Sequence, residues 1–175
     1  MEWSELDNRA KPTSWTLPAE RAKNGRSHTI HLSDAARAIL ASVPRIKDNP
    51  YVFTGRGGKP IDNDSHIRDD INAKITELRQ EAGIEPTALE PWTWHDFRRS
   101  GVTYMASVGI APHVADKILN HITGTIQGVA AVYQKFQYSE ERQRALDAWA
   151  AAILGAADGR PVPENVVPIR PNEAA

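Results

Sequence analysis

The sequence contains no cysteine among its 175 residues. Disulfide bonds, Cys-x-x-Cys redox chemistry and thiolate-rich zinc sites are therefore excluded together. Long apolar runs are also missing, because the longest, residues 148–154, is far too short to span a bilayer. The opening residues, MEWSELDNRAK, lack the basic and apolar segments of a signal peptide, so we expect a cytoplasmic protein with no membrane partner.

An excess of charge of one sign is missing as well. Lys and Arg total 21, Asp and Glu total 22, and the net charge is −1. This balance argues against a protein that coats nucleic acid through bulk charge, but it permits a local basic groove. Hydrophobic residues make up 41% and charged residues 25%, which is typical of a globular chain that buries a core without disulfide bonds.

The first third of the chain predicts strands and turns. Short runs with aromatic or alternating apolar residues occur at residues 3–6, 15–17 and 27–32. Asn24-Gly25 is a strong hairpin signal, because both residues tolerate positive φ. We therefore expect about three antiparallel strands, with Lys23 at the lip of the hairpin turn. Another short strand is expected at residues 51–54, before a glycine-rich loop.

The remaining segments predict helices. Ser33-Asp34 caps a helix that Pro44 closes, and a polar helix runs from about Asp64 to Gln80 and ends at Gly83. Helical spacing recurs at residues 94–108, 111–119, 126–135 and 139–154, and Gly155 is expected to end the last helix. The predicted class is α+β: a small antiparallel sheet of about three strands at the N-terminus, packed against a mostly helical domain. We expect one domain over residues 1–155 and a disordered tail over residues 156–175.

The segment Thr93-Trp94-His95-Asp96-Phe97-Arg98 carries the clearest chemistry. His95 and Arg98 are three residues apart, so on a helix they share a face in its first turns, where free N–H groups favour an anion. A guanidinium and an imidazole aimed at one point suit a tetrahedral phosphate. The alternative is that His95 caps or packs and Arg98 forms a surface ion pair.

Two later motifs extend this interpretation. Leu119-Asn120-His121 ends a predicted helix, and a run of small residues leads to Tyr133. A phenol, with a pKa of about 10, becomes a useful nucleophile only when cations flank it. The chain therefore suggests phosphoryl transfer through a covalent phosphotyrosine, with candidate residues Lys23, His95, Arg98, His121 and Tyr133. The alternatives are His121 as a helix cap and Tyr133 as a residue at the edge of the core, and Tyr138, five residues further on, is the second candidate for the nucleophile.

The order of these motifs resembles the tyrosine recombinases, the phage-type integrases in particular. The resemblance covers roughly residues 1–150, and the hairpin with Lys23 lies where that family keeps its catalytic lysine. Asn120 stands where the family usually has glycine. The spacing from His121 to Tyr133 is similar to that of integrase variants with an inserted loop.

The resemblance implies site-specific DNA recombination or integration on double-stranded DNA, with no metal and no other cofactor. Tyr133 would attack a scissile phosphate, and Arg98 would neutralise its oxygens. His95 would assist proton transfer, Lys23 would protonate the leaving 5′-oxygen, and His121 would donate to a phosphate oxygen. A metal site built from His28, His31, His95 and His121 is disfavoured, because His28 and His31 face opposite sides of a strand.

The family also has a first catalytic arginine, which lies shortly before a segment resembling Trp3-Ser4-Glu5-Leu6. No residue of this sequence supplies it, so the resemblance predicts an incomplete integrase domain. A misplaced start, gene decay and a genuine short form are the three explanations. The alternative function is a non-catalytic DNA-binding remnant of an integrase. A third hypothesis is a generic α+β domain in which the motifs are accidental.

The predicted helix at residues 139–154 leaves a further choice open. Its apolar face, with Leu146, Trp149 and Ile153, either packs on its own domain or docks on a neighbouring protomer. The family resemblance implies the second, which is self-association on DNA through the C-terminal helix.

Overall fold

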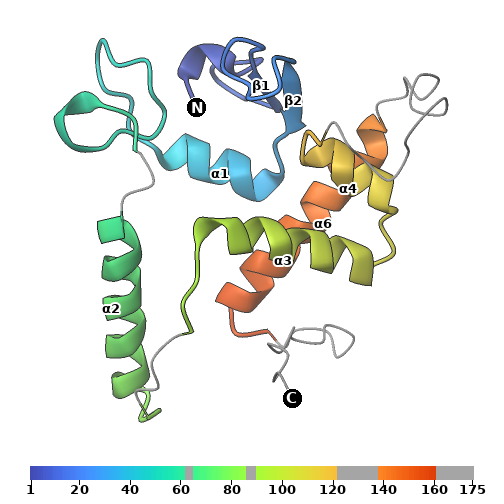
Figure 1. Ribbon diagram of the computed structural model, residues 1–175. Coiled ribbons are helices and arrows are strands. Elements are labelled where there is room, and N and C mark those ends of the chain that lie inside the picture. Colours follow the sequence, from blue (N-terminus) through green and yellow to red (C-terminus); the bar gives the residue numbers. More distant parts are fainter. Residues whose placement is uncertain (62–64, 86–89, 122–137, 161–175) are drawn as a thin grey trace.

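The structure, a computed structural model, describes residues 1–61, 65–85, 90–121 and 138–160 (Figure 1). Its elements, in chain order, are the 3-10 helix η1 (Trp3–Glu5), strands β1 (Ser14–Leu17) and β2 (His28–His31), helix α1 (Asp34–Ser42), the 3-10 helix η2 (Arg56–Gly58), and helices α2 (Ser65–Glu81), α3 (Trp94–Ser107), α4 (Pro112–Ile118) and α6 (Ser139–Ala157). The class is α+β, as predicted. The hairpin and α1 lie beside the group α3, α4 and α6, while α2 stands to one side (Figure 1). The expected helix at residues 126–135 lies outside the described residues.

The prediction of about three strands is not confirmed in the part of the chain that the structure describes. Its sheet has two antiparallel strands, β1 and β2, with Ser14 opposite His31 and Leu17 opposite His28. Residues 3–5 instead coil into η1, and Leu6 keeps only an isolated bridge to Trp15.

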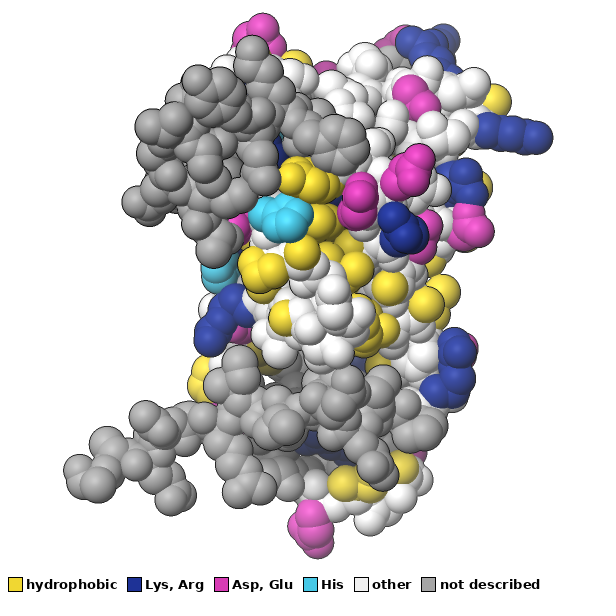
Figure 2. Space-filling view, turned by 90° about the vertical axis from the view of Figure 1, so that its right-hand side faces the viewer, with side chains coloured by type: hydrophobic (Ala, Val, Ile, Leu, Met, Phe, Trp, Pro, Cys, Tyr) yellow, Lys and Arg dark blue, Asp and Glu magenta, His cyan; other side chains and the backbone are white. Residues whose placement is uncertain are grey.

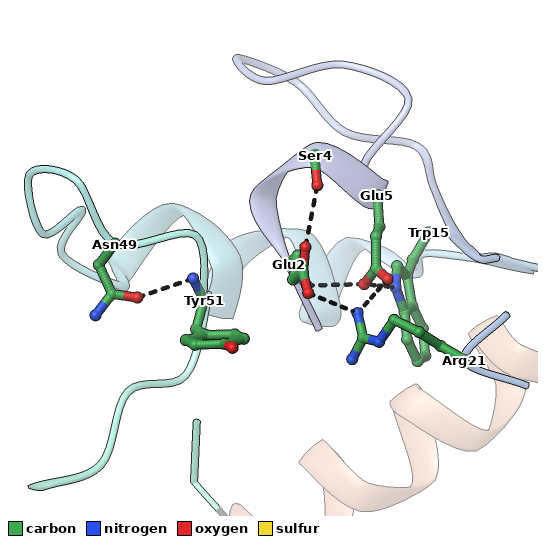
Figure 3. Close-up of polar contacts among 7 residues, drawn as sticks. All are labelled: Glu2, Ser4, Glu5, Trp15, Arg21, Asn49 and Tyr51. Atoms are coloured by element: carbon green, nitrogen blue, oxygen red, sulfur yellow. Dashed lines mark hydrogen bonds and ion pairs between the residues drawn. The ribbon is translucent and has the colours of Figure 1, made fainter. Parts of the chain in front are cut away.

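Side-chain hydrogen bonds explain why η1 replaces the expected strand. The Glu5 carboxylate accepts from the Glu2 N–H at 2.8 Å and from Trp15 Nε1 at 3.0 Å, and it also forms an ion pair with Arg21 (Figure 3). Burial raises the pKa of Glu5, but the Trp15, Glu2 and Arg21 contacts outweigh it and the pKa is lowered. These contacts close a tight turn, so the backbone cannot stay extended.

The connection between the two strands is longer than the predicted tight hairpin. A turn within it is closed by the Gly25 N–H donating to the Ala22 carbonyl at 2.9 Å, with Gly25 at φ 66°. Lys23 is exposed on this turn. The strand expected at residues 51–54 is reduced to isolated bridges, from Tyr51 to Glu2 and from Thr54 to Pro60.

Helix α1 starts as predicted, because the Ser33 side chain accepts from the Ala36 N–H at 3.3 Å. It buries Leu40 in a first core cluster with Leu6, Leu32 and Val52. Helix α2 is less embedded: its expected apolar face stays partly open, and Leu78 is 51% exposed. Neither α2 nor any other described helix is long and apolar enough to cross a membrane.

Helix α6 supplies a second core cluster. Ala145 is fully buried with Met105 and Ala115, and Leu146 and Trp149 pack against them. The helix continues past Gly155 to Ala157, so the prediction that Gly155 ends it is wrong.

Local packing and backbone conformation explain where α6 begins and ends. A glycine inside a helix costs only about 1 kcal/mol, and Gly155 is buried beneath the guanidinium of Arg160. The chain turns instead at Gly159, with φ 71°, where the Arg160 N–H donates to the Gly155 carbonyl at 2.8 Å. At the other end, Tyr138, with φ 50°, precedes the first helical residue.

Candidate functional site

The start of α3 is set by a capping box, as its sequence predicts. The Thr93 N–H and hydroxyl donate to the Asp96 carboxylate at 2.8 and 2.9 Å. These hydrogen bonds lower the pKa of Asp96. The box fixes the helical register, so His95 is the second residue of α3 and Arg98 lies one turn further along. Both side chains are exposed.

Arg98 and His121 meet at the end of α4. The Arg98 Nη2 donates to the Leu119 carbonyl at 2.6 Å and lies 2.9 Å from the His121 Nε2. On the other side of the same ring, His121 Nδ1 lies 3.2 Å from Asp116 Oδ1. The structure thus joins two motifs that the sequence singled out separately, and it adds an acidic partner.

Three successive carbonyls at this end of α4, those of Ile118, Leu119 and Asn120, accept hydrogen bonds from three different parts of the chain. We call them the α4 carbonyl end. His28 of β2 lies with its Nε2 3.0 Å from the first, Arg98 of α3 donates to the second, and Asn24 Nδ2 donates to the third at 3.2 Å. Helix C-termini leave such carbonyls without intrahelical partners, so these side chains satisfy them.

Asn120 gives this end its shape. Its backbone is left-handed, with φ 55°. Glycine and asparagine tolerate that region better than other residues. This explains physically how Leu119-Asn120-His121 can stand where the resembled family has Leu-Gly-His.

The sequence pattern of the phage integrase family matches residues 1–137. The chain belongs to the phage integrase family. It is 28% identical over 171 residues to "Prophage integrase IntA" of Escherichia coli (strain K12), and the alignment covers 96% of this chain and 37% of that relative. The chain therefore spans little more than a third of the length of this curated relative. No solved structure matches it significantly.

For the other predicted site residues of this integrase-family chain, the structure gives no direct contact with the Arg98–His121 pair among the described residues. Lys23 is the neighbour of Asn24, whose bond to Asn120 ties the lysine turn to the segment that carries His121. His95 is exposed on α3, and in the described part of the chain its side chain forms no hydrogen bond with the Arg98–His121 pair. Tyr133, the predicted nucleophile, lies outside the described residues.

Two residues near the pair were missed by sequence reasoning. Arg142 of α6 is half-buried and donates to the Thr29 carbonyl of β2, and burial lowers the pKa of its guanidinium. His28 was considered only as a metal ligand. Burial lowers its pKa, and the charges of Arg142 and Arg98 lower it further, against the opposing bond to Ile118. A basic residue on an otherwise apolar helix face was the available signal for Arg142.

The charge distribution of this integrase-family chain is local rather than global. On the face in Figure 2, basic and acidic side chains are interspersed, in line with the net charge of −1. Around the α4 carbonyl end, by contrast, Arg98, Arg142 and two histidines gather with Asp116 as the acidic partner. Among the described residues, no three His, Asp or Glu side chains cluster as metal ligands would. The basic side chains around the α4 carbonyl end are suited to binding an anion.

Proposed function

We propose that this chain is the catalytic part of a site-specific recombinase that cuts and rejoins double-stranded DNA through a phosphotyrosine. The observation that carries the proposal is the contact of Arg98 with His121 at the α4 carbonyl end. It supports a single anion site built from the two motifs, within a chain that belongs to the phage integrase family.

A phosphate would bind by competing for the guanidinium of Arg98. That group now uses Nη2 for both the Leu119 carbonyl and His121. A guanidinium has five N–H donors, so it can keep the carbonyl bond and still turn a fork toward two phosphate oxygens. The first turn of α3 adds its helix dipole, and His95 is exposed beside it.

The proposed chemistry exchanges one phosphate ester for another. The Tyr133 oxygen attacks phosphorus and forms a phosphotyrosyl bond, while the bond from phosphorus to the 5′-oxygen breaks. His95 assists removal of the phenolic proton, and Lys23 gives a proton to the leaving 5′-oxygen. Arg98 stabilises the charge on the non-bridging oxygens. The energy of the ester is retained, so rejoining needs no metal or other cofactor.

The remaining parts of the proposal concern organisation. We place the domain over residues 1–157, two residues beyond the boundary expected from the sequence because α6 continues to Ala157, with a tail after it and the chain in the cytoplasm. Self-association on DNA through α6 would have to use Ile153 and Leu154, which are 46% and 48% exposed, because Trp149 packs in the chain's own core.

The alternative, a non-catalytic DNA-binding remnant, draws on the N-terminal part. Arg21 forms ion pairs with Glu2 and Glu5, so it is occupied and does not stand in for the family's first arginine (Figure 3).

A suicide DNA substrate separates these functions. The chain is incubated with a pool of nicked duplexes of randomised sequence and analysed on a denaturing gel. An adduct that survives denaturation and disappears in Tyr133→Phe, but not in the control Tyr138→Phe, supports the recombinase. Salt-dependent binding without an adduct supports the remnant, and no salt-dependent binding rules out both.

A further inference from the structure

We infer that Asp116 is a positioning residue for His121: it holds the imidazole with its proton on Nδ1 and the lone pair of Nε2 facing Arg98. This inference rests on the proposed function of the site for its catalytic meaning. The geometry that supports it involves three side chains: Arg98 of α3, Asp116 of α4 and His121, which follows α4.

The donors and acceptors around the ring assign the tautomer of His121. A guanidinium has donors and no acceptor, so the 2.9 Å contact between Arg98 Nη2 and His121 Nε2 requires that Nε2 carry no proton. A neutral imidazole with a bare Nε2 has its proton on Nδ1. The Nδ1–H then donates to Asp116 Oδ1 at 3.2 Å, and an ionised carboxylate can only accept.

The local backbone brings Asp116 into position. The His121 N–H donates to the Asp116 carbonyl at 3.0 Å, immediately after the left-handed turn at Asn120. The Asp116 side chain is 25% exposed and that of His121 is 45% exposed, so water competes for the ring. Contacts on both ring nitrogens therefore decide which of the two faces the guanidinium.

This arrangement has a consequence for the arrival of a phosphate. When phosphate oxygens take the N–H groups of Arg98, the lone pair of His121 Nε2 is released as a proton acceptor. The Asp116 carboxylate still holds the ring through Nδ1, so Asp116 sets Nε2 as the ring nitrogen that faces the arriving phosphate.

The chain offers a matched control in a second histidine–aspartate pair. His31 Nε2 of β2 lies 3.6 Å from Asp147 Oδ1 of α6, and both residues are described. It combines the same residue types in a partly exposed setting, but it has no contact with Arg98 in the described structure. Removing Asp147 therefore tests whether any carboxylate loss disturbs His121.

The test is nitrogen-15 NMR of the His121 ring in the free 175-residue chain. The wild type should show mainly the Nδ1–H form. Asp116→Ala should shift the tautomer ratio about fivefold toward Nε2–H, which is the change expected when one partly exposed hydrogen bond of about 1 kcal/mol is lost. Asp116→Asn, which keeps an oxygen acceptor and is the variant to use if the alanine form does not fold, should retain more of the Nδ1–H form. Asp147→Ala should leave the His121 signals unchanged.

Two results would overturn the inference: a wild-type ring mainly protonated on Nε2, or an Asp147→Ala shift as large as that of Asp116→Ala. An unchanged ratio in both Asp116 variants would overturn it too. The adduct assay is kept separate. Slower adduct formation in Asp116→Ala, with unchanged DNA binding, extends the inference to catalysis, while a wild type that forms no adduct counts against the proposed function and not against the tautomer assignment.

Discussion

Arg98 and His121 are 23 residues apart in the sequence, yet the guanidinium Nη2 of one lies 2.9 Å from the imidazole Nε2 of the other. The same nitrogen donates to the Leu119 carbonyl. One side chain therefore closes the end of α4 and presents its charge to the proposed phosphate site, so structure and function are linked at this position.

Two substitutions of Arg98 should separate the effect of its positive charge on DNA binding from the effect of its two-pronged shape on adduct formation. Arg98→Ala should lower the salt dependence of DNA binding by about one phosphate contact, while Arg98→Lys should keep that slope. Both should abolish adduct formation, because a lysine cannot form the two-pronged contact. Filter binding at several salt concentrations and a denaturing gel measure the two effects.

The neighbour Arg99 is the control for this pair of variants. It is exposed and forms an ion pair with Asp96 at 3.2 Å, away from the α4 carbonyl end. Arg99→Ala should leave adduct yield near that of the wild type. Equal loss in Arg98→Ala and Arg99→Ala would contradict the specific role of Arg98.

Substitutions at Asn120 should follow backbone conformation. Asn120→Gly should be neutral or slightly stabilising, because glycine adopts the observed φ of 55° without steric cost. Asn120→Ala should lower the free energy of unfolding by about 1 kcal/mol, since the left-handed region disfavours a β-carbon. Urea denaturation of both variants measures the difference, and the opposite order would refute the conformational argument.

Trp149 should behave as a core residue. The Trp149 ring packs closely against Gly101, because a β-carbon added to that glycine would lie 3.4 Å from atoms of the ring. The ring also packs against the core cluster that contains Ala145. Trp149→Ala should lower the free energy of unfolding by about 3 kcal/mol, whereas the control Ile153→Ala, at a residue 46% exposed, should cost far less. Light scattering with DNA should show the same mass for wild type and Trp149→Ala; a mass lost only in the variant would instead support docking through this face.

His28 should make stability depend on pH. Its pKa is lowered below the ordinary 6.5, chiefly by burial, so folding favours the neutral ring. The stabilising contribution is therefore complete above pH 6.5 and is lost as the pH falls below 6.5 through the folded-state pKa. His28→Gln keeps an amide donor for the Ile118 carbonyl and should lose less stability than wild type between pH 7.5 and 5.5. Urea midpoints measure this, with His66→Gln on α2 as the control.

Local signals predicted much of the helical part. The Ser33 cap of α1 and the capping box of α3 depend on residues within three positions of one another, and both are present. The expected strand at residues 3–6 failed because Glu5 binds Trp15 and Arg21, which are distant in the sequence. Gly155 failed as a helix end because its burial depends on Arg160 folding back over it.

The candidate site divides in the same way. Motif order singled out Arg98 and His121 as members of one candidate phosphate site, and the structure places the two side chains in contact. The roles expected for these residues and for Lys23, His95 and Tyr133 stay predictions. The partners that build the site, including Asn24, His28 and Arg142, reach across from the hairpin and α6. No spacing along the chain announces such contacts, because they exist only after the elements have packed.

The long reach of these contacts bears on when the site comes into being during synthesis. Asn24 and Asn120 are 96 residues apart, and Arg142 and Thr29 are 113 apart. At a ribosomal rate of about 5–20 residues per second, the lysine turn waits roughly 5–20 s for the carbonyl it will bind. The bond from α6 can form only later still. On a nascent chain, Asn24 and His28 are therefore made well before the carbonyls that they contact, and these long-range contacts are complete only after Arg142 has been translated.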